Sequence, residues 1–206
     1  MEREAFLARL APASTMPVAD APPVPPVPME GDLLDTWRER AAELGVVVHD
    51  VVTANDARDL VRSLAEERAI SDFCSWEDEH LPVHGIAGYL ATAGLTEHVV
   101  GTEPVAGLDP VGLGITGADA LLAETGSVVV TTGPGRSRFA SLLPALHVVV
   151  TTPGAVRPSL REAMGDLAVD TANTVVITGP SRTGDIEGIL VKGVHGPGEV
   201  HVLLVP

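Results

Sequence analysis

The sequence has a single cysteine, Cys74, among 206 residues. One thiol cannot form a disulfide within the chain, and it cannot supply the four thiolates that an iron–sulfur cluster or a structural zinc ion takes. We therefore expect no cofactor in this chain. The acids Asp72, Glu77 and Asp78 lie near Cys74 in the sequence. Negative charge raises a thiol pKa, so Cys74 is expected to be a small buried apolar residue rather than a nucleophile.

Long apolar runs are also missing. No run reaches the ~18 residues that a membrane-spanning helix requires. The first residues, Met1-Glu-Arg-Glu, lack the basic and then apolar pattern of a signal peptide. The sequence therefore predicts no membrane span and a cytoplasmic location.

Positive charge is scarce, with 13 Lys and Arg against 28 Asp and Glu and a formal net charge of −15. Nucleic acid and anionic membranes are recognised by clustered basic residues, so neither is expected as the main partner. The charge is uneven. Residues 1–110 hold 20 acids and 7 bases, whereas residues 111–206 hold 8 acids and 6 bases. The second half keeps its arginines and loses most of the competing negative charge, as a small-anion site requires.

Proline marks the boundary of the folded part. Residues 1–30 contain 7 of the 17 prolines, a composition typical of an extended arm or linker. The remaining length suits one well-buried domain. We therefore predict a proline-rich N-terminal segment at 1–30 and a single domain at 31–206.

Within that domain, short apolar runs rich in β-branched residues alternate with helical patterns, which predicts an α/β fold with a mostly parallel sheet covered on both faces. Helices are expected at residues 32–44, 53–68, 83–93, 117–123 and 139–143. Strands are expected at residues 46–52, 70–76, 98–100, 127–132, 146–151, 174–178 and 200–205, and around Ile115.

One glycine-rich turn follows the strand predicted at 127–132 and precedes a short helix. It contains Gly133, Gly135, Arg136 and Arg138. Backbone N–H groups and a helix start can converge on an anion at such a place, and arginine can hold a carboxylate in a bidentate manner. The turn lacks the Lys-Ser/Thr ending of a nucleoside triphosphate loop. It is either a small-anion site or simply a turn.

Upstream, Thr116 is expected to cap the helix at 117–123, with Asp119 in its first turn. Glu124 and Thr125 would follow at the end of that helix. A carboxylate is electrostatically disfavoured there, so Glu124 needs a cationic partner, such as Arg136 or Arg138, or a chemical task. We expect Glu124 to accept a proton or to position the arginines.

A second polar turn follows the strand predicted at 174–178. It brings Ser181, Arg182, Thr183 and Asp185, with a helix start expected at Ser181 or Thr183, and His195 lies in a later glycine-rich turn. In open α/β sheets the loops after the strands meet in one crevice. The two turns, together with Thr116, Asp119 and Glu124, are therefore predicted to form one substrate or anion site. An ion pair between Arg182 and Asp185, and a structural role for His195, are the alternatives.

Two other patterns do not hold as sites. His80 and His84 have the spacing of two ligands on a helix, but Pro82 lies between them and the H-E-x-x-H pattern is absent. Gly112, Gly114 and Gly117 match a dinucleotide string, but they fall within an apolar stretch rather than after it. We predict no metal site and no dinucleotide.

The order of four short segments closely resembles the LUD domain of the lactate utilization protein C family. They are Thr116-Gly-Ala-Asp119, Ala123-Glu124-Thr125-Gly126, Gly133-Pro-Gly-Arg136 and Ser141-Leu-Leu-Pro144. Residues 177–187, followed by residues 193–198, resemble the C-terminal signature of the same family. The resemblance covers about residues 31–206. It implies a three-layer α/β/α fold of the ribose-5-phosphate isomerase and CoA-transferase type.

By the same resemblance, the chain is expected to be the cluster-free subunit of a bacterial system that oxidises L-lactate to pyruvate. Its partners would be two proteins, one or both carrying iron–sulfur clusters, and its ligand a small carboxylate. Whether this subunit is itself catalytic stays open. The alternatives are a scaffold subunit without a ligand, or an independent enzyme acting on a phosphorylated sugar or a CoA thioester.

Overall fold

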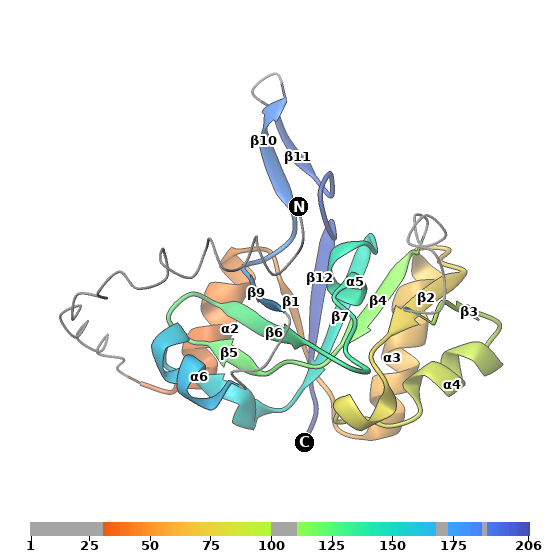
Figure 1. Ribbon diagram of the computed structural model, residues 1–206, viewed down its shortest axis with the longest axis horizontal. Helices are drawn as coiled ribbons and strands as arrows, with labels where there is room; N and C mark the ends of the chain where they lie inside the picture. The colour runs from red at the N-terminus through yellow and green to blue at the C-terminus, as the bar shows by residue number, and fades with distance from the viewer. Residues whose placement is uncertain (1–30, 100–110, 168–172, 187–188) are drawn as a thin grey trace, which may run out of the picture.

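The computed structural model describes residues 31–99, 111–167, 173–186 and 189–206, and only the backbone of 184–186 and 189–192 (Figure 1). A six-stranded sheet forms the centre of this part, and every neighbouring pair of its strands is parallel. In spatial order its strands are β1 (Val47–Asp50), β12 (Glu199–Leu204), β7 (Leu146–Thr151), β4 (Leu113–Thr116), β2 (Asp72–Ser75) and β3 (Thr96–Glu97).

A smaller four-stranded sheet lies beside the first (Figure 1). Its order is β8 (Val156–Arg157), β5 (Ala120–Leu122), β6 (Ser127–Thr132) and β9 (Asn173–Ile177). β6 is antiparallel to both β5 and β9, whereas β5 and β8 are parallel. The two remaining strands, β10 (Arg182–Ile186) and β11 (Ile189–Lys192), form an antiparallel hairpin that stands out from the body.

Two of the helices begin at polar side chains that cap them. The side chain of Asp32 accepts hydrogen bonds at the start of α2 (Leu33–Glu43), and Thr53 and Asp56 form a capping box at the start of α3 (Ala54–Glu67). The other helices are α4 (Ile86–Thr92), α5 (Phe139–Leu142) and α6 (Leu160–Asp166), with short 3-10 turns at Asp78–His80 and Pro153–Ala155.

Helices cover both faces of the large sheet, which makes a three-layer α/β/α arrangement. On one face, α5 packs so closely that a Cβ on Gly114 would lie 1.8 Å from the carbonyl oxygen of Ala140. On the other face, Arg68 at the end of α3 donates to Glu199 at 2.6 Å. Glu199 pairs in register with Leu146, and Leu146 pairs in register with Leu113, so these three side chains lie on the same face of the sheet. Gly114 is the next residue of its strand and therefore faces the opposite side, toward α5. The side chain of Glu199 thus faces away from α5.

The core lies between the layers and contains Trp37, Phe73, Ile115 and Leu203, each fully buried. The indole of Trp37 on α2 donates to the carbonyl oxygen of Ser127 on β6 at 3.1 Å, so this helix is hydrogen-bonded to the small sheet. Cys74 is buried on β2, as predicted, and burial, helped by the charge of Asp72, raises the pKa of its thiol to about 12.

Most of the predicted strands are confirmed, with β6 and β7 at the predicted bounds and β1, β2, β9 and β12 within a few residues of them. The α/β class and the mostly parallel sheet are also confirmed. The strand predicted at 98–100 lies instead at Thr96–Glu97. The proline-rich segment at 1–30 lies outside the described residues and stays a prediction. In the described part of the chain no helix is long and apolar enough to span a membrane.

The helix predicted at 117–123 is wrong. Residues 120–122 form strand β5, antiparallel to β6. Leu121 is buried in the main core, while Ala120 and Leu122 pack with Ala163 of α6 on the opposite face. Apolar residues on both sides fit a strand between two layers. Thr116 is therefore the last residue of β4 rather than a helix cap.

Two further local predictions fail with it. Glu124, Thr125 and Gly126 form the turn between β5 and β6, not the end of a helix, and Gly126 takes the positive φ of 70° that the turn needs. No helix begins at Ser181 or Thr183, because residues 182–186 form strand β10.

Candidate functional site

The carboxyl ends of β2 and β4 mark the candidate site. These strands are neighbours, but within the large sheet the strand after β2 is the edge strand β3, whereas the strand after β4, reached through β5 and β6 of the small sheet, is β7 on the other side. Ligands of open α/β sheets bind where the connections diverge in this way. Trp76 follows β2 directly, and Asp119 follows β4 by three residues.

An arginine reaches this point from the loop after β6. Arg136 donates from Nη2 to both carboxylate oxygens of Asp119, at 2.7 and 2.6 Å. The backbone N–H and the hydroxyl of Thr131 donate to the same carboxylate, at 2.6 and 3.0 Å. Among the described residues the guanidinium donates only from Nη2, and its buried Nε has no partner, so it keeps donors that are not used within the fold.

Trp76 fixes the position of that guanidinium. The centre of the guanidinium lies 4.3 Å from the centroid of the indole ring, a cation–π contact. The indole N–H donates to the carbonyl oxygen of Ser137 at 3.1 Å, and the backbone N–H of Trp76 to Ile115 at 3.0 Å. The ring is thus held by the strand on one side and by the arginine's own loop on the other.

The loop at residues 133–137 packs against the segment after β2. The backbone N–H of Glu77 donates to the carbonyl oxygen of Gly135 at 2.9 Å. Gly135 has a φ of +69°, and a Cβ there would lie 2.8 Å from Nε2 of His80 and 2.9 Å from a carboxylate oxygen of Glu77. Glycine is therefore required by its backbone angle and by the close approach of both side chains.

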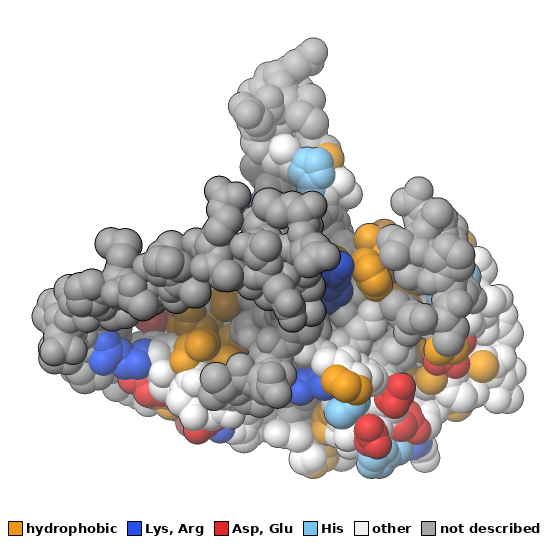
Figure 2. Space-filling view, viewed as in Figure 1, with side chains coloured by type: hydrophobic (Ala, Val, Ile, Leu, Met, Phe, Trp, Pro, Cys, Tyr) orange, Lys and Arg blue, Asp and Glu red, His pale blue; other side chains and the backbone are white. Residues whose placement is uncertain are grey.

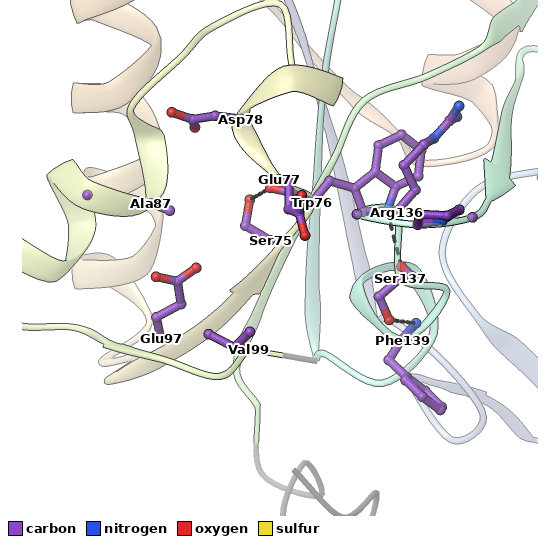
Figure 3. A pocket seen from close by; sticks show the side chains of 14 residues that line it. Ser75, Trp76, Glu77, Asp78, Ala87, Glu97, Val99, Arg136, Ser137 and Phe139 are labelled. Atoms are coloured by element: carbon purple, nitrogen blue, oxygen red, sulfur yellow. Dashed lines mark hydrogen bonds between the residues drawn. The ribbon is translucent and has the colours of Figure 1, made fainter. Parts of the chain in front are cut away.

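A cavity of about 570 Å³ opens between this loop, the segment after β2, the start of α4 and the segment after β3. Its size is in the range of small-molecule sites. Figure 3 shows Asp78 and Glu97 on one side of the cavity, and Trp76, Arg136 and Phe139 on the other. Glu77 also lines it, and Arg136 is the one cation among the described lining residues. Figure 2 shows acidic side chains gathered over the segment between β2 and α4.

The structure brings Asp119, Gly133, Gly135 and Arg136 together, as predicted, but not Glu124 or Thr125. These two lie at the other end of β6, a strand whose six residues span roughly 20 Å. Arg40 of α2 donates to the backbone carbonyl oxygens of Ala123 and Glu124. The expected ion pair between Glu124 and Arg136 is therefore wrong, since Arg136 pairs with Asp119.

Thr125 belongs to a row of hydroxyl groups. Its hydroxyl lies 2.8 Å from that of Ser127, which lies 2.9 Å from that of Thr178. Arg138 is exposed and does not line the cavity, and its guanidinium lies over the ring of Phe139, 5.2 Å from the centroid.

The second predicted turn lies elsewhere again. Arg182 donates to the carbonyl oxygen of Leu44, at the end of α2. Ser181 is bound through its backbone to Pro197 and Gly193, next to the turn that carries the exposed His195. Thr183 and Asp185 lie on the projecting strand β10. The two turns that were predicted to form one crevice therefore lie at separate places in the fold.

Thr116 has a buried role. Its hydroxyl lies 2.9 Å from Nε2 of His147 on β7, and both side chains are fully buried. Burial lowers the pKa of His147 to about 4, so the imidazole is neutral near pH 7. In the described part of the chain, no group of three or more His, Cys, Asp or Glu side chains could hold a metal ion.

Sequence reasoning missed Trp76, Glu77, Glu97 and Thr131. A usable signal was present for two of them, because Trp76 and Glu77 directly follow a predicted strand, where polar and aromatic side chains of α/β sites gather. Glu97 and Thr131 give no comparable local signal.

The comparisons with known proteins agree with this architecture. The LUD domain family matches residues 107–205, the part of the chain that contains β4 through β12. In three dimensions the chain is similar to a DUF162 family protein from Deinococcus radiodurans, with a TM-score of 0.61 and 18% identity, over 84% of this chain and 96% of that one. The fold is therefore an α/β fold of the kind found in that DUF162 family protein.

Several curated relatives are named lactate utilization protein C. Lactate utilization protein C of Halalkalibacterium halodurans is 30% identical over 146 residues, which is 66% of this chain and 64% of that protein. The protein of that name from Macrococcus caseolyticus is 29% identical over 175 residues, 82% of this chain and 75% of the relative. The chain thus spans slightly less than two thirds of the first of these. The chain is therefore similar to lactate utilization proteins C, and its residues 107–205 match the LUD domain family.

Proposed function

We propose that this chain is a cluster-free component of a lactate utilization system and that the cavity beside Arg136 receives a small 2-hydroxy or 2-oxo acid. The name that the relatives carry supports the setting. The main support for the site is the position of the cluster of Trp76, Arg136 and Asp119. The cluster lies on one wall of a cavity, at the point where the connections from β2 and β4 diverge.

The distribution of charge in the cavity suits a 2-hydroxy acid. A carboxylate would lie against Arg136, which keeps donors that are not used within the fold. The hydroxyl group would face the carboxylates on the other side, of which Glu77 lies nearest to the loop of Arg136, since its side chain approaches Gly135. Glu77 is then better placed than Glu124 to accept the hydroxyl proton.

The same carboxylates disfavour one alternative. Glu77, Asp78 and Glu97 all line the cavity. A phosphorylated sugar or a CoA thioester brings several negative charges, which three nearby carboxylates would repel. A ligand with one negative charge and a hydroxyl group fits this lining better.

Oxidising a 2-hydroxy acid removes two electrons with its protons, and ordinary side chains are not hydride acceptors. We propose that this chain holds no cofactor of its own and that the electrons pass to partner proteins. The resemblance to the family indicates iron–sulfur proteins as those partners.

The binding step is tested by calorimetry on the full chain with L-lactate, D-lactate and pyruvate. We expect binding of at least one acid and a loss of about tenfold or more in affinity with Arg136→Gln, because a charged hydrogen bond is removed. Arg138→Gln is the matched control and should leave the affinity unchanged. No binding of any of the three acids, or equal affinity in both variants, would contradict the proposal.

The role of Glu77 needs a second assay. L-lactate-dependent dye reduction by the partner proteins is measured with this chain absent, or added as wild type, Glu77→Gln or Glu124→Gln. We expect Glu124→Gln to restore activity and Glu77→Gln to fail. Full activity with both variants would mean that Glu77, in this cavity, is not the proton acceptor.

A scaffold subunit without a ligand remains the second candidate. Arg136 and Arg182 both form hydrogen bonds within the chain, to Asp119 and Leu44. Arginines that form such hydrogen bonds within the chain can stabilise the fold without binding any ligand. Stable complex formation with the partners, unaffected by Arg136→Gln and without acid binding, would favour this candidate.

A further inference from the structure

His80 lies between two cavities of the molecule. The first is the cavity beside Arg136, which Glu77 lines and His80 does not. The second, of about 270 Å³, opens beside the carboxyl ends of β4 and β7, and His80 lines it whereas Glu77 does not. A short 3-10 turn at Asp78–His80 brings the two side chains near each other, since the backbone N–H of His80 donates to the carbonyl oxygen of Glu77 at 2.9 Å.

The side chains of Glu77 and His80 converge on Gly135. A Cβ on this glycine would lie 2.8 Å from Nε2 of His80 and 2.9 Å from a carboxylate oxygen of Glu77. The separation of that nitrogen and that oxygen is therefore at most the sum of the two distances. In the described part of the chain no hydrogen bond or ion pair joins them directly. Two consecutive hydrogen bonds span such a gap, so one water molecule can bridge the two groups.

The imidazole of His80 is also in contact with the outside of the molecule. A carboxylate oxygen of Glu79 lies 3.4 Å from the same Nε2, and the side chain of Glu79 is 73% exposed. The side chain of His80 is itself 28% exposed. His80 thus lies between a carboxylate in the first cavity and a carboxylate in water. Imidazole is the side-chain group that most readily takes up and releases protons near neutral pH.

The other charged side chains around His80 already have partners. The carboxylate of Asp78 accepts from the backbone N–H at the start of α4, at 2.8 Å. Asp119, on the segment after β4, pairs with Arg136, on the loop after β6. Among the described residues that line the second cavity, His80 is the one side chain that can carry a charge. A proton on the imidazole therefore has Glu79 and water as its next acceptors.

We propose that His80 relays a proton from Glu77 to the second cavity when a 2-hydroxy acid is oxidised in the first. The inference rests on the proposed function of the first cavity. The hydroxyl O–H bond of the acid breaks, and its proton joins the carboxylate of Glu77. A bridging water passes a proton on to Nε2 of His80, and the imidazole releases one to water in the second cavity. Both side chains thereby return to their initial states. The hydrogen on carbon leaves with two electrons to the redox acceptor of the partner proteins.

The relay is tested by L-lactate-dependent dye reduction with the partner proteins. His80→Ala should lower kcat about tenfold or more, because a proton transfer is lost. Calorimetry should show an unchanged affinity for the acid, since His80 does not line the first cavity. His84→Ala, at an exposed position, is the matched control and should leave kcat unchanged.

Imidazole added to the solution provides a readout that a purely structural role would not give. His80→Ala would enlarge the second cavity, which is open to solvent, so free imidazole can enter where the side chain was. We expect it to restore part of the activity of His80→Ala, and to leave Glu77→Gln inactive. The two variants should also not be additive, because both act on one proton. Adding His80→Ala to Glu77→Gln should therefore lower kcat no further.

A crystal structure of the full chain tests the geometry without any activity measurement. We expect one ordered water molecule within hydrogen-bond distance of both Nε2 of His80 and the carboxylate of Glu77. An imidazole turned away from Gly135, or two groups that no water joins, would overturn the relay.

The outcomes separate this inference from the proposed function. Full activity of His80→Ala beside an inactive Glu77→Gln, or a loss with His80→Ala that imidazole does not restore, would overturn the relay alone. A wild-type chain that binds none of the acids would contradict the proposed function, and the relay with it.

Discussion

Arg136 donates from one nitrogen to both carboxylate oxygens of Asp119, and Thr131 donates twice to the same carboxylate. The pair joins the segment before β5 to the end of β6 and to the loop that follows it. Its side chains are 22% and 18% exposed, so the pair is largely withdrawn from water. The stability of the fold and the position of the candidate ligand donor therefore depend on one carboxylate.

Replacing Asp119 with Ala should lower the free energy of unfolding by about 3 kcal/mol, because the positive charge of Arg136 would stay largely buried without its partner. Asp119→Asn should lower it less, since the amide oxygen can still accept from Thr131. Urea titration measures both changes. Asp35→Ala, at an exposed position of α2, is the control and should change the free energy by less than about 0.5 kcal/mol. Equal stability of Asp119→Ala and the control would contradict this role.

Gly114→Ala should be strongly destabilising, by about 3 kcal/mol or more, because the new methyl group would overlap the backbone of α5. The relevant atom is the carbonyl oxygen of Ala140, which cannot move without the helix. Thermal or urea unfolding measures the loss. Gly133→Ala is the matched control, since a Cβ there has nothing within 4 Å and the stability should hardly change. A stable Gly114→Ala variant would mean that α5 does not pack on this strand.

The chain should lose stability as the pH falls below about 6.5. Burial lowers the pKa of His147 to about 4, and it also lowers the pKa values of His49 and His201. The unfolded chain takes up protons near pH 6.5 while the folded chain does not, so stability is complete above that pH and falls as the pH drops toward 4. For His147 alone the loss amounts to about 3 kcal/mol.

Urea titrations at pH 7, 6 and 5 measure this dependence. His147→Gln removes the titrating group and should flatten the curve. His84→Gln, at an exposed position, should leave its shape unchanged. A wild type equally stable at pH 7 and pH 5 would contradict the burial of these imidazoles.

The thiol of Cys74 should be inert in the folded protein. It is buried, and its pKa is raised to about 12, so almost no thiolate is present near pH 8. A disulfide reagent should therefore react with one thiol per chain in denaturant and with far less in native buffer. Rapid and complete reaction of the native protein would show that β2 is not covered as described.

The parts of the fold that were predictable from sequence are those set by local pattern. Strand β7 was predicted at its observed bounds because Leu146–Thr151 is a continuous apolar and β-branched run with Pro144 before it and Pro153 after it. The starts of the helices predicted at 32–44 and 53–68 were equally local, since a short polar side chain, Asp32 or Thr53, stands just before each helical pattern.

Prediction failed where tertiary contacts outweigh propensity. Ala120, Leu121 and Leu122 favour a helix in isolation, but β6 supplies an antiparallel partner and two separate layers bury both faces. The turn at 124–126 therefore follows a strand rather than the predicted helix, and Glu124 lies at the end of β6 that is far from Arg136.

The candidate site was only half predictable for the same reason. The glycine and arginine content of residues 133–136 indicated a functional loop, whereas the residue on which Arg136 lies, Trp76, is 60 positions earlier in the chain. Nothing in the local sequence relates these two residues. They come into contact because β2 and β4 are neighbours in the sheet and run parallel. The sequence of one segment does not determine which strands become neighbours.

Trp37 restricts the movement of the small sheet relative to α2. Its indole N–H is bonded to the carbonyl oxygen of Ser127, and its ring is fully buried beneath the small sheet. Any sliding of that sheet over α2 would have to break this bond and expose the ring to water. The two sheets should accordingly behave as one rigid unit on the timescale of ligand binding, and access to the cavity should be controlled by its loops alone.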